Sequence, residues 1–266
     1  MNLQVEKEII LSEITGKSKE FLIAHQDFVL NKKQSAGYKK MLSQLQRGNP
    51  LAYVVGYKWF FGNKFTVTKN VLIPRPETEQ LVERAIQLND KATFKKVIDV
   101  GVGSGAIIIS LGKTLNKLKA DFYGIDISSK ALAIAKKNSK NILKNSSIKF
   151  VKGNLINPLA KKLSGQQKVL ITANLPYLSK KELREPTIKK EPRLALYGGK
   201  NSYDLIEKFI KQVSLLDLKQ SVILLEINYN QAKALSSKIK KYLPNADIKI
   251  HQDFSKFDRI IEITLA

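Results

Sequence analysis

The sequence contains no cysteine, which excludes disulfide bonds, a cysteine nucleophile and a thiolate metal site. It also lacks an uncharged apolar run of the roughly 18 residues that indicate a membrane helix, so no transmembrane span is expected. Residues 1–8 mix both charges and lack the apolar core of a secretion signal. These absences predict a cytoplasmic protein with no metal site and no membrane association.

Arginine is scarce although the chain is strongly basic. The formal net charge is +23, but arginine supplies only six of the 46 basic residues. Arginine is the side chain best suited to gripping bases and phosphates, and here the abundant lysines are spread along the whole chain. The charge therefore does not predict dedicated nucleic-acid binding. It is compatible with an acidic protein partner.

The length of 266 residues permits one large domain and one small domain. Three early segments carry apolar residues at helical spacing: Glu8–Ile14, Glu20–His25 and Ala36–Leu45. Gly48 and Pro50 then signal the end of a helix. We therefore expect a small helical domain over residues 1–56, of the kind that docks a partner or covers a site.

Aromatic residues flank Gly62 and Asn63, which predicts a β-hairpin that turns at this pair. We assign residues 57–72 to this hairpin linker and residues 73–266 to the larger domain. From Lys95 onward, strand-like and helical segments alternate, which predicts a doubly wound, Rossmann-like α/β sheet of seven strands. The expected strands are Val97–Val100, Phe122–Ile125, Ile148–Val151, Val169–Ala173, Val222–Ile227, Ile248–His251 and Arg259–Thr264. A short connection joins the last two, so they predict a reversed hairpin at the edge of the sheet.

The most informative motif is Asn174-Leu175-Pro176-Tyr177, which follows the apolar strand Val169–Ala173. Open α/β sheets bind ligands at the carboxyl ends of their strands, where this motif lies. The Asn174 side-chain oxygen and the Leu175 backbone carbonyl are the expected hydrogen-bond acceptors. Pro176 stiffens the turn, and Tyr177 is expected to cover the flat face of a substrate. The motif therefore suits a planar nitrogen group, such as an amide or an adenine amine.

A glycine-rich turn, Gly101-Val102-Gly103-Ser104-Gly105, follows an earlier strand and lets the backbone approach a ligand closely. The helix that begins at Ala106 offers amides to the methionine carboxylate of a cofactor. Asp126, about twenty residues further at the next strand end, is placed to accept ribose hydroxyls. Asn154 and Leu155 end the third strand and would flank the adenine. The Gly-x-Gly-x-Gly spacing, together with the Asn174 motif, favours S-adenosylmethionine over a dinucleotide, with S-adenosylhomocysteine as product.

Methyl transfer to an amide is difficult because the nitrogen lone pair is delocalised into the carbonyl group. Two acceptors that hold both N–H groups can favour a pyramidal nitrogen whose lone pair points at the sulfonium methyl group. Deprotonation can follow methylation, so no histidine is needed. We interpret His25 and His251 as surface or packing residues, and Glu226 as a buried structural carboxylate at a strand end.

Taken together, these motifs resemble the glutamine-N5 methyltransferases that modify peptide chain release factors, the PrmC/HemK family. The resemblance covers essentially the whole chain. Its markers are residues 48–53 with Gly56, 60–62, 71–79, 101–105, 174–177, 191–196 with Gly198 and Gly199, 225–227 with Gln231, and Asp258 with Arg259. The chain departs from the family pattern at three places: Leu175 stands where a proline is usual, Asn154 where an aspartate is usual, and Asn201-Ser202 where Asp-Gly is common.

The resemblance implies an S-adenosylmethionine-dependent enzyme that methylates the glutamine of the Gly-Gly-Gln loop of a release factor. It implies that the helical domain helps to recognise this factor. It also implies that Gly101–Gly105, Asp126, Leu155 and Asn174 contact the cofactor, and that Asn174–Tyr177 contact the glutamine. We expect a monomer. Two alternatives share the motifs: a ribosomal-protein glutamine methyltransferase, and an adenine-N6 methyltransferase acting on RNA or DNA.

Overall fold

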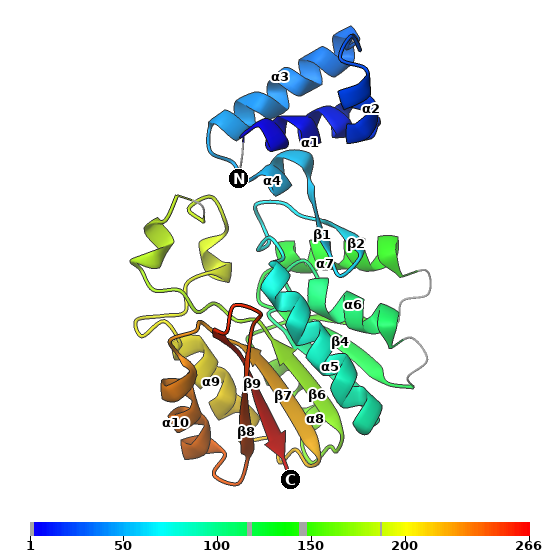
Figure 1. Cartoon of the computed structure of the whole chain (residues 1–266). Helices are drawn as coiled ribbons and strands as arrows, with labels where there is room; N and C mark the ends of the chain where they lie inside the picture. The colour runs from blue at the N-terminus through cyan, green and yellow to red at the C-terminus, as the bar shows by residue number, and fades with distance from the viewer. Residues whose placement is uncertain (1–2, 116–118, 144–147, 187) are drawn as a thin grey trace.

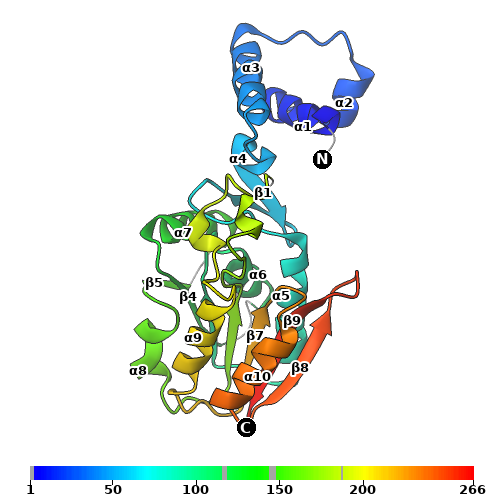
Figure 2. The same ribbon diagram turned by 90° about the vertical axis from the view of Figure 1, so that its left-hand side faces the viewer.

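A computed structural model of the chain describes residues 3–115, 119–143, 148–186 and 188–266. Four helices come first: α1 (Leu3–Thr15), α2 (Lys19–Ala24), α3 (Lys32–Gln46) and α4 (Leu51–Val55). Their core is small and is centred on Ile10, Leu45 and Val54. Figures 1 and 2 show α1–α3 standing apart from the sheet, with α4 and β1 as the connection. The helical unit is therefore free to meet a partner on several sides.

A two-stranded hairpin follows, formed by β1 (Tyr57–Phe60) and β2 (Asn63–Thr66). Its turn residues, Phe61 and Gly62, both have positive φ, at 46° and 67°, as a type I′ turn requires. The turn therefore lies one residue earlier than the Gly62-Asn63 pair that we predicted. Asn63 instead opens β2, where its side-chain amide donates to the Phe61 carbonyl at 2.7 Å and supports the turn.

The larger domain contains a seven-stranded sheet in the order β5-β4-β3-β6-β7-β9-β8. The strands are β3 (Lys96–Val100), β4 (Asp121–Asp126), β5 (Lys149–Lys152), β6 (Val169–Ala173), β7 (Ser221–Glu226), β8 (Asp247–Gln252) and β9 (Asp258–Leu265). The seven predicted strands are confirmed. The predicted reversed hairpin at the edge is confirmed: β8 and β9 pair in antiparallel fashion, β8 is the edge strand, and β9 lies between β8 and β7. The hairpin turn returns the chain from the outer strand into the gap beside β7.

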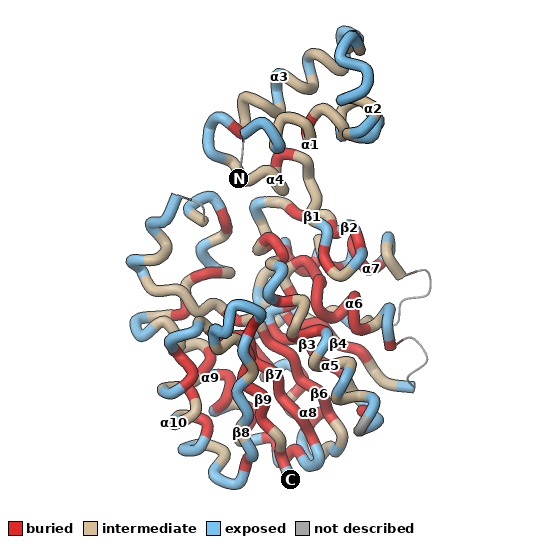
Figure 3. Tube along the Cα trace, viewed as in Figure 1, coloured by how far each residue is buried: buried red, intermediate tan, exposed pale blue. Residues whose placement is uncertain are grey.

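Helices cover both faces of this sheet, which gives three layers. One face packs against α5 (Glu79–Lys91), α6 (Ala106–Thr114) and α7 (Ser129–Ile142). The other packs against α8 (Ala160–Leu163), α9 (Asp204–Val213) and α10 (Ala232–Tyr242). Successive strand residues serve opposite faces: Val97 belongs to the first core and Ile98 to the second. Figure 3 shows the buried residues concentrated along the strands between the two helical layers.

Short 3₁₀ helices complete the chain: η1 (Pro76–Thr78), η2 (Asn157–Leu159), η3 (Glu182–Arg184) and η4 (Arg193–Ala195). None of the helices in the described ranges combines the length and the apolarity that a membrane crossing requires. The strand order reverses direction at β3, whose neighbours are β4 on one side and β6 on the other. A crevice is expected where connections leave the sheet in opposite directions, beyond the carboxyl ends of β3 and β6.

Candidate active site

A cavity of about 310 Å³ lies at this end of the sheet. Five segments supply most of its walls: the linker between β2 and α5, the glycine turn after β3, the end of β4, the loop after β5 and the turn after β6. Cavities of a few hundred Å³ are of the size that holds small ligands. The predicted cofactor and substrate motifs, although far apart in sequence, thus meet around one space.

The glycine turn needs positive φ at Gly101, Gly103 and Gly105, where φ is 80°, 53° and 85°. Gly101, Gly103 and Ser104 line the cavity. A Cβ atom at Gly105 would lie 2.5 Å from the Ile109 Cδ1 atom. Gly105 therefore serves the packing of α6 on the sheet, whereas Gly103 leaves room for a ligand beside its backbone.

Asp126 also lines the cavity, at the end of β4. Its two carboxylate oxygens accept the backbone N–H groups of Gly103 at 2.9 Å and Ser128 at 2.8 Å. Burial raises the pKa of Asp126, and these amide donors oppose the shift. Each carboxylate oxygen has a second acceptor site, so Asp126 can accept ribose hydroxyls while it fixes the glycine turn. Ser128, not Asp126, caps α7 by accepting the Ala131 N–H at 3.2 Å.

Asn154 and Leu155 lie together on the cavity wall after β5. Leu155 is 6% exposed and has a φ of 56°. Leucine rarely adopts this left-handed conformation, and such strain concentrates at ligand sites. The strained backbone turns the Leu155 side chain into the core while both residues keep contact with the cavity. This geometry agrees with the prediction that Asn154 and Leu155 flank the flat adenine ring of the cofactor.

The turn after β6 contributes Asn174, Leu175 and Pro176 to the cavity. The Asn174 side-chain NH₂ donates to the Thr78 hydroxyl oxygen at 3.2 Å. Leu175 is 3% exposed, and its Cδ2 atom lies 3.1 Å from the position that a Cβ at Gly101 would take. The unusual leucine therefore packs directly over the glycine turn and ties the two motifs together.

Tyr177 is not one of the described residues that line the cavity. Its hydroxyl donates to Oε1 of Glu226 at 3.2 Å. Its backbone carbonyl accepts the Gln231 side-chain amide at 3.1 Å, and the same amide donates to the Ser202 hydroxyl at 2.9 Å. Burial raises the pKa of Tyr177. In this structure Tyr177 anchors the turn, and its contact with a substrate stays a prediction.

Glu226 ends β7 beneath this turn and is 2% exposed. Burial raises the pKa of Glu226, and the hydroxyls of Thr78 and Tyr177 act in the opposite direction. Its Oε2 atom accepts no hydrogen bond of normal geometry from any residue that the structure describes. Glu226 is therefore a buried carboxylate with few partners, next to the predicted catalytic turn.

Sequence reasoning missed the contribution of the linker between β2 and α5. The lining residues of this segment are Lys69, Asn70, Val71, Leu72, Pro74, Arg75 and Thr78. Glu191, which is 6% exposed, holds the linker by accepting the Ile73 N–H at 3.0 Å and by pairing with Arg75. The prolines beside Arg75 indicate an extended segment. Such a segment has no regular periodicity from which the side that faces a ligand could be predicted.

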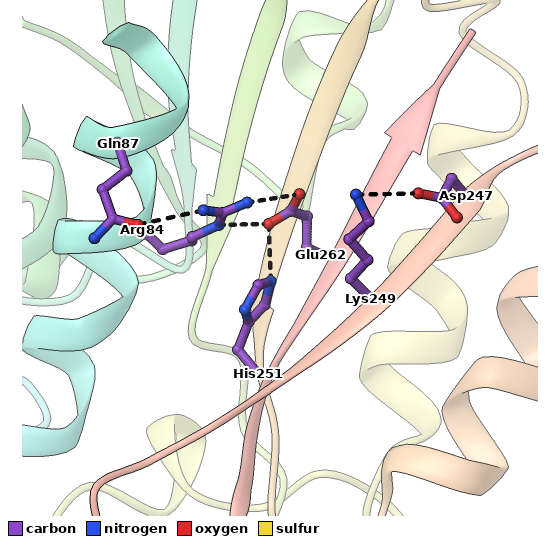
Figure 4. A network of polar contacts seen from close by, with 6 residues as sticks. All are labelled: Arg84, Gln87, Asp247, Lys249, His251 and Glu262. Atoms are coloured by element: carbon purple, nitrogen blue, oxygen red, sulfur yellow. Dashed lines mark hydrogen bonds and ion pairs between the residues drawn. The ribbon is translucent and has the colours of Figure 1, made fainter. Parts of the chain in front are cut away.

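The two histidines lie outside the lining of this cavity, as the sequence analysis expected. His25 is exposed and stacks on Phe21 with ring centroids 4.1 Å apart. His251 contacts Glu262 at 2.9 Å, beside the Arg84 side chain (Figure 4). Across the described ranges, no three His, Cys, Asp or Glu side chains are grouped in a way that could hold a metal ion.

Two family profiles match the chain: that of the PrmC N-terminal domain over residues 3–56, and that of a methyltransferase domain over residues 93–262. Among solved structures, the hMettl16 catalytic domain in complex with a MAT2A 3′UTR hairpin has a TM-score of 0.60 at 17% identity, over 77% of each chain. The N-terminal domain of human METTL16 in complex with SAH has a TM-score of 0.52 at 20% identity, again over 77% of each chain. These likenesses show the methyltransferase fold.

Curated relatives are closer in sequence. The release factor glutamine methyltransferase of Flavobacterium psychrophilum is 35% identical over 96% of this chain and 89% of that protein. The enzymes of the same name from Borreliella burgdorferi and Staphylococcus aureus are 34% and 31% identical, each over 97% of this chain and over 85% and 91% of their own lengths. The matches run through both domains and include the glycine turn and the turn after β6. The chain belongs to the release factor glutamine methyltransferase family.

Proposed function

We propose that this chain transfers the methyl group of S-adenosylmethionine to the side-chain amide nitrogen of the glutamine in the Gly-Gly-Gln loop of a peptide chain release factor. One observation carries the proposal beyond family membership. Asn174 lines the same cavity as the glycine turn, and its NH₂ group is taken by Thr78. The Asn174 oxygen is therefore the atom left to accept an N–H from a substrate amide.

The residues of the cavity fit the methyl donor. The positive-φ residue Gly103 leaves space beside the backbone, and α6 begins shortly after it, at Ala106, with its free amides. Amides at a helix start suit a carboxylate, and Asp126 suits the two ribose hydroxyls. S-adenosylmethionine supplies, when bound, a methyl group on a positively charged sulfur.

Asn174 and Leu175 act on the nucleophile. Their side-chain and backbone oxygens accept the two N–H groups of the glutamine amide, which favours a pyramidal nitrogen with its lone pair aimed at the methyl carbon. One C–N bond then forms as one C–S bond breaks, and the nitrogen loses a proton to water. Alignment of this kind can lower a bimolecular barrier by roughly 7–11 kcal/mol.

The domains divide the remaining tasks. Residues 1–56 would recognise the body of the release factor, residues 57–72 would connect, and residues 73–266 would perform catalysis. The small core of the helical unit and its separation from the sheet support a docking role. We infer further that the enzyme acts as a monomer in the cytoplasm and needs no nucleic acid. Sedimentation of the enzyme alone and with its substrate measures this stoichiometry.

The decisive assay supplies a methyl-labelled donor with one acceptor at a time. The acceptors are purified release factor, its Gly-Gly-Gln variant with Gln→Ala, ribosomal proteins, and ribosomal RNA. Label is expected on the release factor alone. Label on the Gln→Ala variant would contradict the assigned position, and label on RNA or ribosomal proteins would contradict the assigned substrate.

A further inference from the structure

Three side chains converge on Glu226 or on its immediate partner. Tyr177 donates its hydroxyl to Glu226, Thr78 lowers the pKa of the same carboxyl, and Asn174 donates to Thr78. Thr78 is 4% exposed and lies at the end of η1, directly before α5. The predicted acceptor for the substrate is thus hydrogen-bonded to Thr78, which lies close enough to the buried Glu226 carboxylate to lower its pKa.

The chemistry of these groups gives the hydrogen bonds a direction. An ionised carboxylate can only accept hydrogen bonds, whereas a threonine hydroxyl can donate one and accept others. If the Thr78 proton is directed to Glu226, a lone pair of its oxygen remains for Asn174. The two ends of an asparagine side chain have nearly the same shape, so a hydrogen-bond partner must decide which end faces a ligand.

Alternative donors for this carboxylate are few. Arg259 lies near enough for its charge to act on Glu226, but its guanidinium donates to Asp253 at 3.0 and 3.2 Å and contacts the Ile227 carbonyl at 3.5 Å. Glu77 is an acid and raises the pKa of Glu226. The hydroxyls of Tyr177 and Thr78 are therefore the partners that respond to the Glu226 charge at the site.

We propose that Glu226 and Thr78 are positioning residues, which fix the Asn174 carboxamide so that its oxygen faces the substrate amide. Neither residue touches the reacting atoms. With the carboxamide reversed, its NH₂ group would meet the N–H groups of the glutamine, and both sides would be donors. The inference rests on the proposed function, because it assigns the orientation of the acceptor in that reaction.

Thr78→Val tests the proposal, since valine keeps the shape of threonine and removes the hydroxyl. We expect kcat for methylation of the release factor to fall about five- to tenfold, the loss expected when an ordinary hydrogen bond no longer selects one of two orientations. The KM for the donor and the unfolding temperature should change little. Thr78→Ser, which restores a hydroxyl, should recover most of the rate.

A double-mutant cycle separates orientation from a general structural effect. In an Asn174→Ala background, which has no carboxamide to orient, Thr78→Val should change the residual rate less than twofold. Equal losses in both backgrounds would overturn the proposal, as would a Thr78→Val variant with the kcat of the wild type. If the wild-type enzyme fails to methylate the release factor at all, the proposed function fails instead.

Glu226→Gln tests whether Glu226 acts through Thr78. Glutamine presents an NH₂ group that can donate to Thr78, so the direction of the hydrogen bonds is no longer fixed. We expect a loss of kcat similar to that of Thr78→Val, and no larger loss in the Thr78→Val, Glu226→Gln double variant. An unchanged kcat for Glu226→Gln, or fully additive losses in the double variant, would show that Glu226 does not act through Thr78.

Discussion

Glu226 on β7 and Glu262 on β9 are each 2% exposed, but their surroundings are opposite. Glu262 accepts two hydrogen bonds from the Arg84 guanidinium, at 2.6 and 3.1 Å, and contacts His251 at 2.9 Å (Figure 4). Glu226 accepts a hydrogen bond from Tyr177 and has the Thr78 hydroxyl as a further partner, and its Oε2 accepts no hydrogen bond of normal geometry among the described residues. Both carboxylates face the α5 side of the molecule, where Thr78 directly precedes α5 and Arg84 lies within it.

The pKa shifts follow these surroundings. Burial pushes the pKa of each carboxyl upward, but at Glu262 the bonds and charge of Arg84, with His251, overcome burial and lower the pKa. At Glu226 burial wins and the pKa is raised. A bidentate partner offsets the cost of burying a charge, whereas an under-partnered buried charge costs stability and is typical of a working site. We therefore assign Glu262 to the stability of the fold and Glu226 to the support of the Asn174 turn.

The largest expected effect falls on catalysis. Asn174→Ala should reduce kcat by about 10²–10³-fold, as is typical when one preorganised polar group is lost, while binding of S-adenosylmethionine stays nearly intact. Steady-state kinetics with labelled donor, and equilibrium binding of the donor, measure the two quantities. Asn154→Ala at the other wall of the cavity is the control, and should raise the KM for the donor with little change in kcat. Near-normal kcat in Asn174→Ala would remove Asn174 from the site.

Arg84→Leu should affect the fold and spare the chemistry. It leaves Glu262 buried without its bidentate partner, which we expect to lower the free energy of unfolding by about 2–3 kcal/mol; partial exposure of Arg84 keeps this below the range for fully buried pairs. Lys249→Ala is the matched control from Figure 4, because the Lys249–Asp247 pair is 3.6 Å long and both side chains are more than 60% exposed. Its effect should stay within about 0.5 kcal/mol. Urea unfolding measures both variants, and equal losses would contradict the assignment.

Replacing each glutamate with glutamine gives the comparison its most direct test. The folded-state pKa of Glu262 is lowered from 4.5, so its stabilisation is present above that pH and is lost as the pH falls through the folded pKa. Glu262→Gln should therefore cost about 1–2 kcal/mol at pH 8 and little in acid. The raised pKa of Glu226 has the opposite sign, because ionisation costs stability as the pH rises above 4.5.

Glu226→Gln should consequently unfold at the same or a higher urea concentration than the wild type at pH 8, while its kcat falls. Glu262→Gln should unfold at a lower urea concentration and keep its kcat. Paired urea and kinetic measurements at pH 8 give all four numbers. If Glu226→Gln lost as much stability as Glu262→Gln, the two carboxylates would have the same structural role, and the proposed division would be wrong.

The strands of the sheet were predictable because each is a short apolar run with turn residues beside it. The insertion of β9 between β7 and β8 was not, since strand order depends on pairing between distant segments. The predicted position of the hairpin turn was wrong because Phe61 adopts a positive φ, which is rare for a phenylalanine and could not be predicted from its residue type. The local sequence pattern therefore predicts helices and strands well. It fails where contacts between distant segments determine strand order or backbone conformation.

The site divides in the same way. Asn174, Asp126 and the glycine turn could be predicted because they follow strands of a parallel sheet, whose carboxyl ends meet at one edge. The partners of the site come from contacts across the fold: Thr78 is 96 residues from Asn174, and Glu191 is 118 residues from Ile73. Both lie in segments with no regular periodicity. Their roles depend on the folded position of the linker at the cavity wall, which local sequence does not determine.

Asp99 extends the comparison to a third buried carboxylate, one residue before the end of β3. It is 1% exposed; its Oδ1 accepts the Thr172 hydroxyl at 2.9 Å, and its Oδ2 lacks a hydrogen-bond partner among the described residues. Burial raises the pKa of Asp99 to about 7, with a smaller contribution from the charge of Asp126. Like Glu226, and unlike Glu262, it accepts no hydrogen bond from a cationic side chain among the described residues.

The sign of the pH effect follows from this raised pKa. The folded state retains the Asp99 proton that the unfolded chain releases near pH 4, so ionisation removes stability progressively as the pH rises from about 4 to about 7. Asp99→Asn abolishes that loss. The variant should match the wild type at pH 4.5 and exceed it by about 1 kcal/mol or more at pH 8, as measured by urea unfolding at the two pH values. Parallel stability curves for the two proteins would show that Asp99 keeps its charge at no cost, and that a missing cationic partner alone does not distinguish Glu226 from Glu262.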